Sequence, residues 1–459
     1  MKKSLYLLIV FLAQFAFADQ AYIKIGEARA KKSNMAFPHF NNQGSNNSGA
    51  STGAAAEIYT AAVKDLEMST YFQMISNAAF LEDPTKTGIK PQPGLANGFK
   101  FEPLKTIGAE FLIRGGYEMI GNELTLEMFL YQVSESKLLM GKRYKAPAKQ
   151  GKQIGHTLAN DVLEALTGVK GPFLSKIVTT SDRGEKGIKE VFTMNRDGTE
   201  IEKLSNHHSI AVSANWSNDA KKIAYSVFTK FIKKDGSAMS NVSLYVLDLA
   251  TGKRVLTSYR PGQNSGAAFS PDGKSIYLGM SMGSGAADIY RINISGEVIT
   301  RLTKGPAGAI NVEPTLSPDG QKIAFSSERG GRPMIYVMNS DGGGIKRLTF
   351  DGVYNSSPSW SPDGKKIAFA GQDNDHFDIF VMNADGSNIV RVTTAKKANG
   401  KAAHNEDPSF SPDSRFVVYT SNRTGKNQIF ISTVDGAEER RVTNDSYNYY
   451  KPKWSKNIE

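Results

Sequence analysis

The residues whose types and spacing best fit a chemical role form the segment Gly279–Gly283 (GMSMG), which matches the G-x-S-x-G pattern of serine hydrolases. In those enzymes the central serine is a nucleophile held on a sharp turn between a strand and a helix. Here the segment follows a strand-like run and leads into Ser284-Gly285-Ala286, which gives no sign of a helix. The sequence therefore favours a loop, and a secreted propeller hydrolase of peptidase type using Ser281 is kept as the alternative function.

The sequence gives little support for a metal site or for thiol catalysis. The chain has six histidines and no cysteine, which excludes thiol catalysis and cysteine-ligated metals. No His-x-His or His-Glu-x-x-His spacing of a zinc site occurs. Asp373, Asp375 and Asp378 gather near His376 and could bind calcium, but a solvated acidic loop is the favoured interpretation. We expect no catalytic residue, no cofactor and no metal.

A repeated five-residue phrase shows which elements surround these residues. Its clearest copies are Phe269–Gly273 (FSPDG) and Trp360–Gly364 (WSPDG), and further copies begin at Trp216, Leu316, Phe410 and Trp454. The copies lie 44 to 53 residues apart, and each unit contains four strand-like runs separated by tight turns. This period predicts an all-β, six-bladed β-propeller over residues 176–459.

The first and last units of the repeat complement each other. The segment Ile177–Leu204 has candidates for three strands of a blade but no preceding copy of the phrase, whereas the C-terminus has that copy alone, at Lys453-Trp454-Ser455. We therefore expect the C-terminal strand to complete the first blade. Such closure leaves no open sheet edge.

The chain begins with an export signal. Lys2 and Lys3 precede an apolar run, and Ala16-Phe17-Ala18 fits a cleavage site, so residues 1–18 are predicted to be a signal peptide. The segment 19–40 follows, with a short strand expected over Ala21–Ile25. Residues 41–56 are rich in Asn, Gly and Ser, which predicts a flexible linker.

Residues 57–171 predict an α/β domain. Helical spacing of apolar residues runs from Glu57 to Ile75 and again from Ile154 to Leu166, where Gly168 is placed as a C-cap. Three strands are expected between these helices, over 111–119, 124–133 and 138–144. The predicted fold class is thus a two-domain protein, with this α/β domain followed by the propeller closed by the C-terminal strand.

The charge balance restricts the partners. The formal net charge is +11, or +9 once Lys2 and Lys3 leave with the signal. Such a charge could attract nucleic acid or an anionic membrane surface. Export argues against nucleic acid, and the basic residues are spread through the repeats, so a solvated basic surface is favoured.

The unequal loops of the propeller predict its binding face. The two tight turns of each unit lie on one face of the ring, and the longer, variable connections lie on the other. Asn, Tyr and acidic residues around a funnel suit recognition of a peptide or protein domain, but ordinary loop polarity explains them equally well, and both interpretations stay open. The predicted rim residues are Gln263, Asn264, Glu313, Tyr354, Asn355, His404, Glu406, Asp407 and Tyr449.

The domain order and one junction together resemble a known family. The segments Gly155-His156-Thr157 and Leu166–Phe173 (LTGVKGPF) lead into the propeller, and with the signal peptide and the small α/β domain they are similar to the TolB family, the periplasmic component of the Tol-Pal envelope system. The resemblance implies a periplasmic, monomeric, non-enzymatic adaptor. Such an adaptor would support outer-membrane integrity and constriction at cell division.

The same resemblance implies two protein partners. The lipoprotein Pal would bind the rim residues named above, with Glu313 as the best match to an acidic contact of the family and Gln263 standing where a family member carries His. The inner-membrane protein TolA would bind the segment from residue 19 to about residue 30. Other outer-membrane lipoproteins would be further partners, nucleic acid would not, and the membrane would be reached only through partners. The residues of the TolA-binding segment are Asp19, Tyr22, Ile23 and Ile25.

Overall fold

The computed structural model describes residues 31–44, 49–232, 236, 238–282, 285–306, 308–373 and 375–458. The chain divides into two compact units, Met1–Lys170 and Gly171–Glu459. The predicted signal peptide and the predicted strand Ala21–Ile25 lie outside the described residues. Among the described helices, none combines the length and the apolar character needed to cross a membrane.

A mixed β-sheet forms the centre of the first unit. Its strands run in the order β3-β1-β6-β7-β8, and β2 also pairs with β6. Strand β1 is parallel to both of its neighbours, whereas β6, β7 and β8 form the antiparallel meander expected over 111–144. The bounds are β1 (Ser33–Ala36), β2 (Asn41–Asn42), β3 (Phe72–Met74), β6 (Phe111–Ile120), β7 (Glu123–Gln132) and β8 (Lys137–Pro147).

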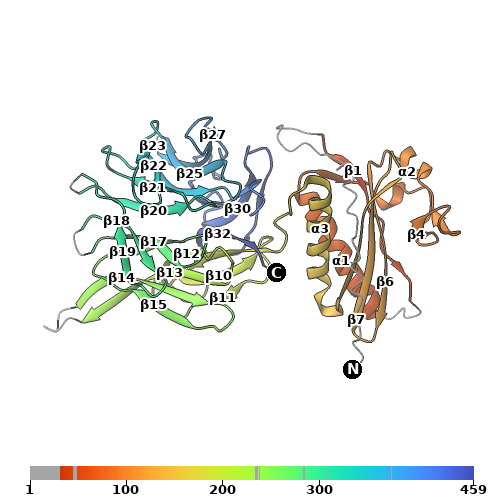
Figure 1. Ribbon diagram of the computed structural model, residues 1–459, viewed down its shortest axis with the longest axis horizontal. Helices are drawn as coiled ribbons and strands as arrows, with labels where there is room; N and C mark the ends of the chain where they lie inside the picture. The colour runs from red at the N-terminus through yellow and green to blue at the C-terminus, as the bar shows by residue number, and fades with distance from the viewer. Residues whose placement is uncertain are drawn as a thin grey trace, which may run out of the picture. The chain divides into compact units, whose positions relative to one another are not determined.

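Two helices, α1 (Gly49–Met68) and α3 (Gly151–Thr167), pack against each other beside this sheet (Figure 1). Gly155 permits their close approach, because a Cβ at this position would lie 2.6 Å from the carbonyl oxygen of Ile58. Helix α3 ends as predicted at Gly168, which has φ 77° and donates its N–H to the carbonyl of Glu164. A short 3-10 turn, η2 (Ala148–Gln150), precedes α3.

The predicted linker over 41–56 is wrong for most of its described part. Residues 41–42 form β2, and residues 49–56 are the first two turns of α1. Alanine is the best helix former, and Ala54 and Ala55 are both 6% exposed within the unit. Tertiary burial therefore stabilises a helix in a segment whose Gly and Ser content resembles a linker.

The end of the first helix also differs from the expectation, which extended it to Ile75. Thr70 has φ 66°, a conformation that no helix continues. The next residues form β3, whose Phe72 pairs with Ser33 of β1. The apolar residues after Met68 therefore belong to the edge strand of the sheet.

The segment between β3 and β6 forms a second core. It contains η1 (Asn77–Ala79), β4 (Gly88–Pro91), β5 (Gly98–Phe99) and α2 (Glu102–Thr106). Phe99 and Phe101 from this segment are buried together with Leu112 of β6 and Tyr131 of β7. Because side chains alternate along a strand, Arg114 shares the face of β6 that carries Leu112.

The second unit is the predicted six-bladed propeller, built from six four-stranded sheets. Each blade lies mainly between two copies of the phrase, and its strands are antiparallel. Blade 1 contains β9 (Ser175–Ser181), β10 (Glu190–Asn195), β11 (Glu202–Lys203) and β32 (Tyr449–Asn457); blade 2, β12 (Ala211–Trp216), β13 (Lys222–Ile232), β14 (Ala238–Asp248) and β15 (Arg254–Ser258); blade 3, β16 (Asn264–Phe269), β17 (Ser275–Met280), β18 (Asp288–Asn293) and β19 (Val298–Arg301). Blade 4 contains β20 (Asn311–Leu316), β21 (Lys322–Ser327), β22 (Met334–Asn339) and β23 (Lys346–Arg347); blade 5, β24 (Tyr354–Trp360), β25 (Lys366–Asp373), β26 (His376–Asn383) and β27 (Val390–Arg391); blade 6, β28 (Asn405–Phe410), β29 (Phe416–Ser421), β30 (Gln428–Thr433) and β31 (Glu439–Arg441).

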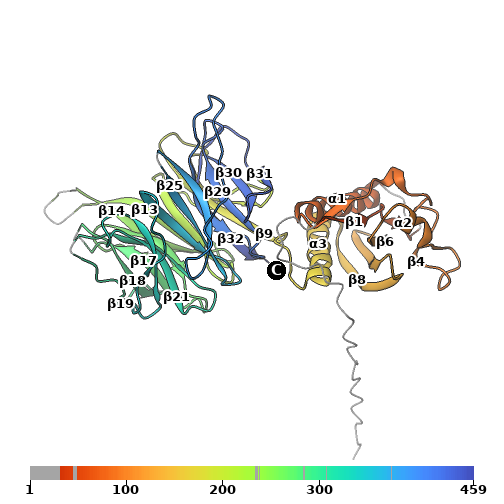
Figure 2. The ribbon, with the colours of Figure 1, turned by 90° about the horizontal axis from the view of Figure 1, so that it is seen from above.

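The C-terminal strand closes the ring, as the sequence predicts. Strand β32 pairs antiparallel with β9, with Trp454 opposite Ile177, and Figure 2 shows the blue β32 beside the yellow β9. The Trp454 indole N–H donates to Ser175 Oγ at 2.6 Å. The innermost strands β12, β16, β20, β24, β28 and β32 each contact the next around the ring.

The repeated phrase forms a turn between the first two strands of a blade, held mainly by hydrogen bonds within the turn. In blade 3, Ser270 Oγ donates to Asp272 Oδ1, which also accepts the Lys274 N–H at 3.0 Å. The hydrogen bond from Ser270 lowers the pKa of Asp272, and Gly273 supplies the positive φ of 68°. The polar groups of the phrase are thus used within the turn, which makes the phrase scaffold.

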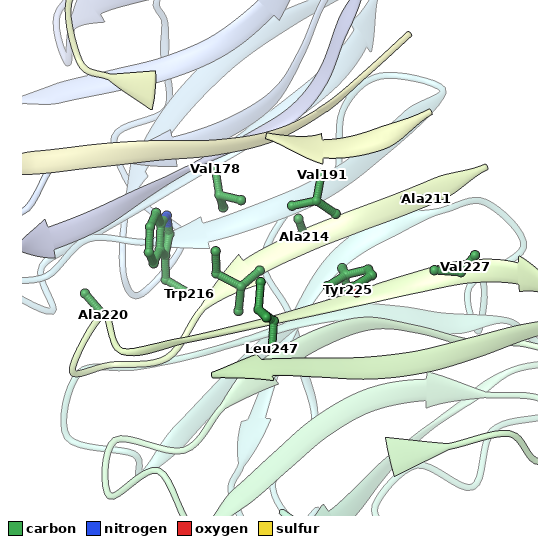
Figure 3. Close-up of a cluster of buried hydrophobic side chains, with 10 residues drawn as sticks. Val178, Val191, Ala211, Ala214, Trp216, Ala220, Tyr225, Val227 and Leu247 are labelled. Atoms are coloured by element: carbon green, nitrogen blue, oxygen red, sulfur yellow. The ribbon is translucent and has the colours of Figure 1, made fainter. Parts of the chain in front are cut away.

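Apolar clusters hold neighbouring blades together. In one of them, Val178 and Val191 of blade 1 pack against Trp216, Tyr225 and Leu247 of blade 2 (Figure 3). All five side chains are at most 7% exposed. Each blade therefore depends on its neighbours for burial of its faces.

Candidate binding site at the propeller channel

The six innermost strands surround a cavity that is open to solvent, and we call it the channel. Every blade contributes to its lining, including blade 1 through the C-terminal strand. The lining residues are Ser213, Ala214, Asn215, Gly266, Ala267, Glu313, Pro314, Thr315, Ser357, Pro358, Ser359, Asp407, Ser409, Lys451 and Lys453.

One backbone feature recurs in all six innermost strands. Each strand has an irregularity in its register at the same place, and each places one residue there with φ between 48° and 69°. These six residues, which we call the bulge ring, all line the channel. They are Ser213, Gly266, Glu313, Ser357, Asp407 and Lys451.

The charged members of the bulge ring pair with one another across blades. Lys451 Nζ donates to a carboxylate oxygen of Glu313 and lies 3.6 Å from Asp407. Ser357 connects the two carboxylates, because its N–H donates to Glu313 at 2.8 Å and its hydroxyl donates to Asp407 at 3.0 Å. One ammonium therefore serves two carboxylates.

The pKa values follow from this arrangement. Burial alone would raise the pKa of Glu313, but the Lys451 ammonium and the Ser357 N–H outweigh it and hold the pKa below its ordinary value. Burial would likewise lower the pKa of Lys451, but Glu313 and Asp407 raise it. The pKa of Lys453, on the same strand, is lowered by burial and by the neighbouring Lys451. The channel thus stabilises the charge of Lys451 and disfavours that of Lys453.

The rim of the channel offers exposed aromatic and acidic groups. Tyr354 is 39% exposed and packs edge-on against Phe377, with ring centroids 5.5 Å apart. His404 lies beside Phe377, and burial lowers its pKa. Glu406 is an exposed residue. Partial desolvation of its carboxylate and the adjacent Asp407 nevertheless raise its pKa to about 7.

The predicted rim residues separate into two groups. Glu313 and Asp407 line the channel, Tyr354, His404 and Glu406 surround it, and the half-buried Gln263 donates from Nε2 to Ser265 Oγ at 2.7 Å. The remaining three predicted rim residues are buried within the propeller. The predicted contacts at Asn264, Asn355 and Tyr449 are therefore corrected, because these side chains are at most 4% exposed.

These three buried residues instead stabilise the loops around them. The Asn264 amide donates to the carbonyls of Val242 and Arg260. The Asn355 amide and the Tyr449 hydroxyl make corresponding hydrogen bonds, to the Asp351 carbonyl at 2.9 Å and to the Asp445 carboxylate at 2.6 Å. Tyr449 consequently has a pKa raised to about 12, mainly by burial.

Sequence reasoning missed four of the six bulge-ring residues, although a signal was present. Each bulge-ring residue lies three positions before the first residue of a phrase copy, as Ser357 does before Trp360 and Lys451 before Trp454. Counting back from the phrase would have found Ser213, Gly266, Ser357 and Lys451. The predicted TolA-binding residues Asp19, Tyr22, Ile23 and Ile25 lie outside the described residues.

The surroundings of Ser281 are those of a structural residue and not of a nucleophile on a strand-to-helix turn. It directly follows β17, which pairs with β18 so that Gly279 is opposite Ile289; the chain therefore runs from strand to strand, whereas an elbow needs a helix. Ser281 is 7% exposed, and its Oγ accepts the Gln263 N–H at 2.9 Å. Gly283, the last residue of the motif, lies outside the described residues.

The acidic cluster near His376 is an ion-pair network. Asp378 pairs with Arg391, accepts the Thr393 hydroxyl, and lies 3.2 Å from His376 Nε2. Within the described parts of the chain, no group of three or more His, Asp or Glu side chains is placed to hold a metal ion.

The fold and the channel define a class: a six-bladed β-propeller, closed by its C-terminal strand, that carries an N-terminal α/β domain. Residues 21–139 match the model of the TolB amino-terminal domain, and residues 163–400 and 354–459 match that of the TolB beta propeller domain. The chain belongs to the TolB family.

Named relatives agree with this assignment. The chain is 32% identical over 306 residues to the Tol-Pal system protein TolB of Desulfosudis oleivorans, which covers 65% of this chain and 63% of the relative. It is 32% identical over 229 residues to the protein TolB homolog of Chlorobium chlorochromatii, covering 50% and 48%. The chain thus spans less than two thirds of these relatives' length. The crystal structure of TolB from Acinetobacter baumannii superposes with a TM-score of 0.75 and 25% identity, over 95% of this chain and 100% of that one.

Proposed function

We propose that this chain is a non-enzymatic periplasmic adaptor of a Tol-Pal system. It binds the lipoprotein Pal at the channel rim and TolA through residues 19–30, and it supports outer-membrane integrity and constriction at division. Membership of the TolB family supports this proposal, as does the name Tol-Pal system protein carried by a relative. The observation that carries it is the bulge ring, where a repeated backbone lines the channel with residues of different types, including Glu313, Asp407 and Lys451.

The chemistry of the rim suits a protein partner. Exposed aromatic residues next to a pocket are typical anchors of protein interfaces, and Tyr354 is exposed here. Glu406 adds an acidic group whose ionisation depends on its surroundings. A projecting loop of Pal with an apolar tip and a basic neighbour would complement these groups.

Glu313 has an indirect role in this proposal. Its carboxylate is already paired with Lys451 and Ser357, so it sets the charge of the channel rather than offering a free contact. We expect Glu313→Lys to weaken Pal binding by placing an unpaired ammonium beside Lys451. Unchanged affinity at matched salt would remove this residue from the site.

A pull-down with purified Pal and TolA tests the proposal. The mature protein should retain both partners, and deletion of residues 19–30 should abolish TolA binding while Pal binding persists. A serine-directed activity probe separates the alternative hydrolase. Labelling of Ser281 together with failure to bind Pal would overturn the adaptor assignment.

A further inference from the structure

The α/β domain contains a pocket that the proposed function does not use. It opens to solvent between the sheet and α2. Its walls are largely apolar, with Phe80, Phe99, Leu104 and Leu112 among the lining residues. Leu81 lies at its edge and is 65% exposed, so apolar surface continues outward from the pocket.

A buried guanidinium lies in this apolar lining. Arg114 is 3% exposed, and its Nη2 donates to the carbonyls of Pro84, Thr87 and Gly88 and to the Thr87 hydroxyl, at 2.8 to 3.1 Å. Its Nε is buried and has no hydrogen-bond partner. Within the described residues, no carboxylate forms an ion pair with it.

A buried charge without a counter-ion is costly. Burial lowers the pKa of Arg114 to about 10, and the approach of Glu82 offsets part of that effect. The Glu82 carboxylate, however, accepts the Lys100 N–H at 3.3 Å. The positive charge of Arg114 is thus only partly balanced, in a lining whose other polar side chains are Glu82, Thr87 and Lys100.

We propose that this pocket binds the C-terminal residue of a peptide, with an aliphatic or aromatic side chain against the apolar walls and its free carboxylate paired with Arg114. A carboxylate is the natural partner of a guanidinium fork. Apolar walls beside one guanidinium suit a single side chain with its adjacent carboxylate. A fatty acid carries the same two groups, and the ligands below separate the two sources. Capture of a terminal carboxylate is an established mode of peptide recognition.

Two matched ligands test the assignment on the mature full-length protein. An acetylated pentapeptide ending in leucine with a free carboxylate should shift the NMR resonances of the Leu104–Arg114 region in a saturable manner. The same peptide with a C-terminal amide should bind at least about tenfold more weakly, because it loses the charge-assisted hydrogen bonds. Equal affinities, absence of a saturable shift, or tighter binding of octanoate than of the peptide would overturn the proposal.

Two variants locate the effect at the pocket. Glu82→Gln removes the acidic side chain of the lining and leaves the Arg114 hydrogen bonds in place, so it should tighten binding of the acid peptide severalfold and leave the amide unchanged. Arg114→Lys keeps a charge but loses the fork, and should abolish the preference for the acid. If Arg114→Lys does not fold, Glu82→Gln decides: an unchanged preference for acid over amide contradicts the site.

Discussion

Lys451 and Lys453 lie two residues apart on β32 and both line the channel, yet we expect their removal to have opposite effects. Lys451 pairs with Glu313 and lies near Asp407, which raises its pKa. Lys453 Nζ donates to the Pro408 carbonyl at 3.3 Å, and burial lowers its pKa. The substitution Lys451→Met therefore leaves two carboxylates without their ammonium, whereas Lys453→Met removes a disfavoured charge.

The expected magnitude follows from the exposure of the pair. Breaking a fully buried ion pair costs about 3–5 kcal/mol, and an exposed pair contributes about 0–1 kcal/mol. The side chains of Lys451, Glu313 and Asp407 are 32%, 24% and 18% exposed, which lies between these limits. We expect Lys451→Met to lower the free energy of unfolding by about 2 kcal/mol. Lys453→Met should be neutral or mildly stabilising.

Tryptophan fluorescence during urea unfolding measures the free energy of unfolding of the propeller itself. The chain has three tryptophans, Trp216, Trp360 and Trp454, and all lie in the propeller, so the α/β domain adds no tryptophan signal. Comparable slopes of the transitions are needed before midpoints are converted into free energies. Equal shifts for the two lysine variants, or a change of less than about 0.5 kcal/mol for Lys451→Met, would refute the reasoning.

The pH dependence provides a second check. Since the pKa of Lys451 is raised, its contribution is complete below the ordinary lysine pKa of about 10.4 and is lost as the pH rises through the folded-state value. Since the pKa of Glu313 is lowered, its contribution is present above the ordinary value of about 4.3 and is lost as the pH falls through the folded-state value. The wild type and Lys451→Met should therefore differ most between about pH 5 and pH 10.

Three further outcomes are expected. Tyr354→Ala should weaken Pal binding about tenfold or more in calorimetry, as loss of an aromatic anchor does, while Ile120→Ala, at a 72% exposed position of the α/β domain, should not; equal affinities would exclude Tyr354 from the site. Deletion of residues 450–459 should open the ring and sharply lower the melting temperature measured by circular dichroism, and an unchanged curve would contradict closure by β32. The Glu406 carboxyl should titrate by NMR near pH 7; because its pKa is raised, ionisation disfavours the folded state, and stability should increase as the pH falls from above 7 towards 4.5, whereas a midpoint near the ordinary value of about 4.3 would refute this.

Much of the fold could be predicted because it repeats. The phrase at Trp360 and its copies gave the period, and the isolated copy at Trp454 gave the closure of the ring. The start of α1 could not be predicted in the same way. Residues 49–56 resemble a linker in composition, and they become helical because Ala54 and Ala55 are buried within the unit, which is a tertiary effect that no local pattern reveals.

The lining of the channel was harder to predict at the level of single residues. Alternation along a regular strand would decide which side chains reach the channel, but each innermost strand is irregular at the bulge. Asn264 is consequently 0% exposed, whereas Gly266, two residues later, lines the channel. The sequence analysis assigned Glu313 and Asp407 to loops, whereas they lie within the innermost strands β20 and β28, and it could not determine which of their neighbours face the channel.

The bulge ring shows how a repeated scaffold can present different side chains in one channel. A left-handed backbone suits glycine and costs other residues roughly 1–2 kcal/mol each, yet Gly266 is the one glycine among the six positions. A Cβ at Gly266 would meet its nearest neighbour, the Glu313 Cα, at 3.5 Å, so space does not dictate glycine there. The backbone geometry is thus fixed six times by the repeat, while the side chain at each position is free to differ. Because Glu313, Asp407 and Lys451 occupy three of these positions in spite of the conformational cost, the charge pattern of the channel is a property of this chain and not of the propeller fold.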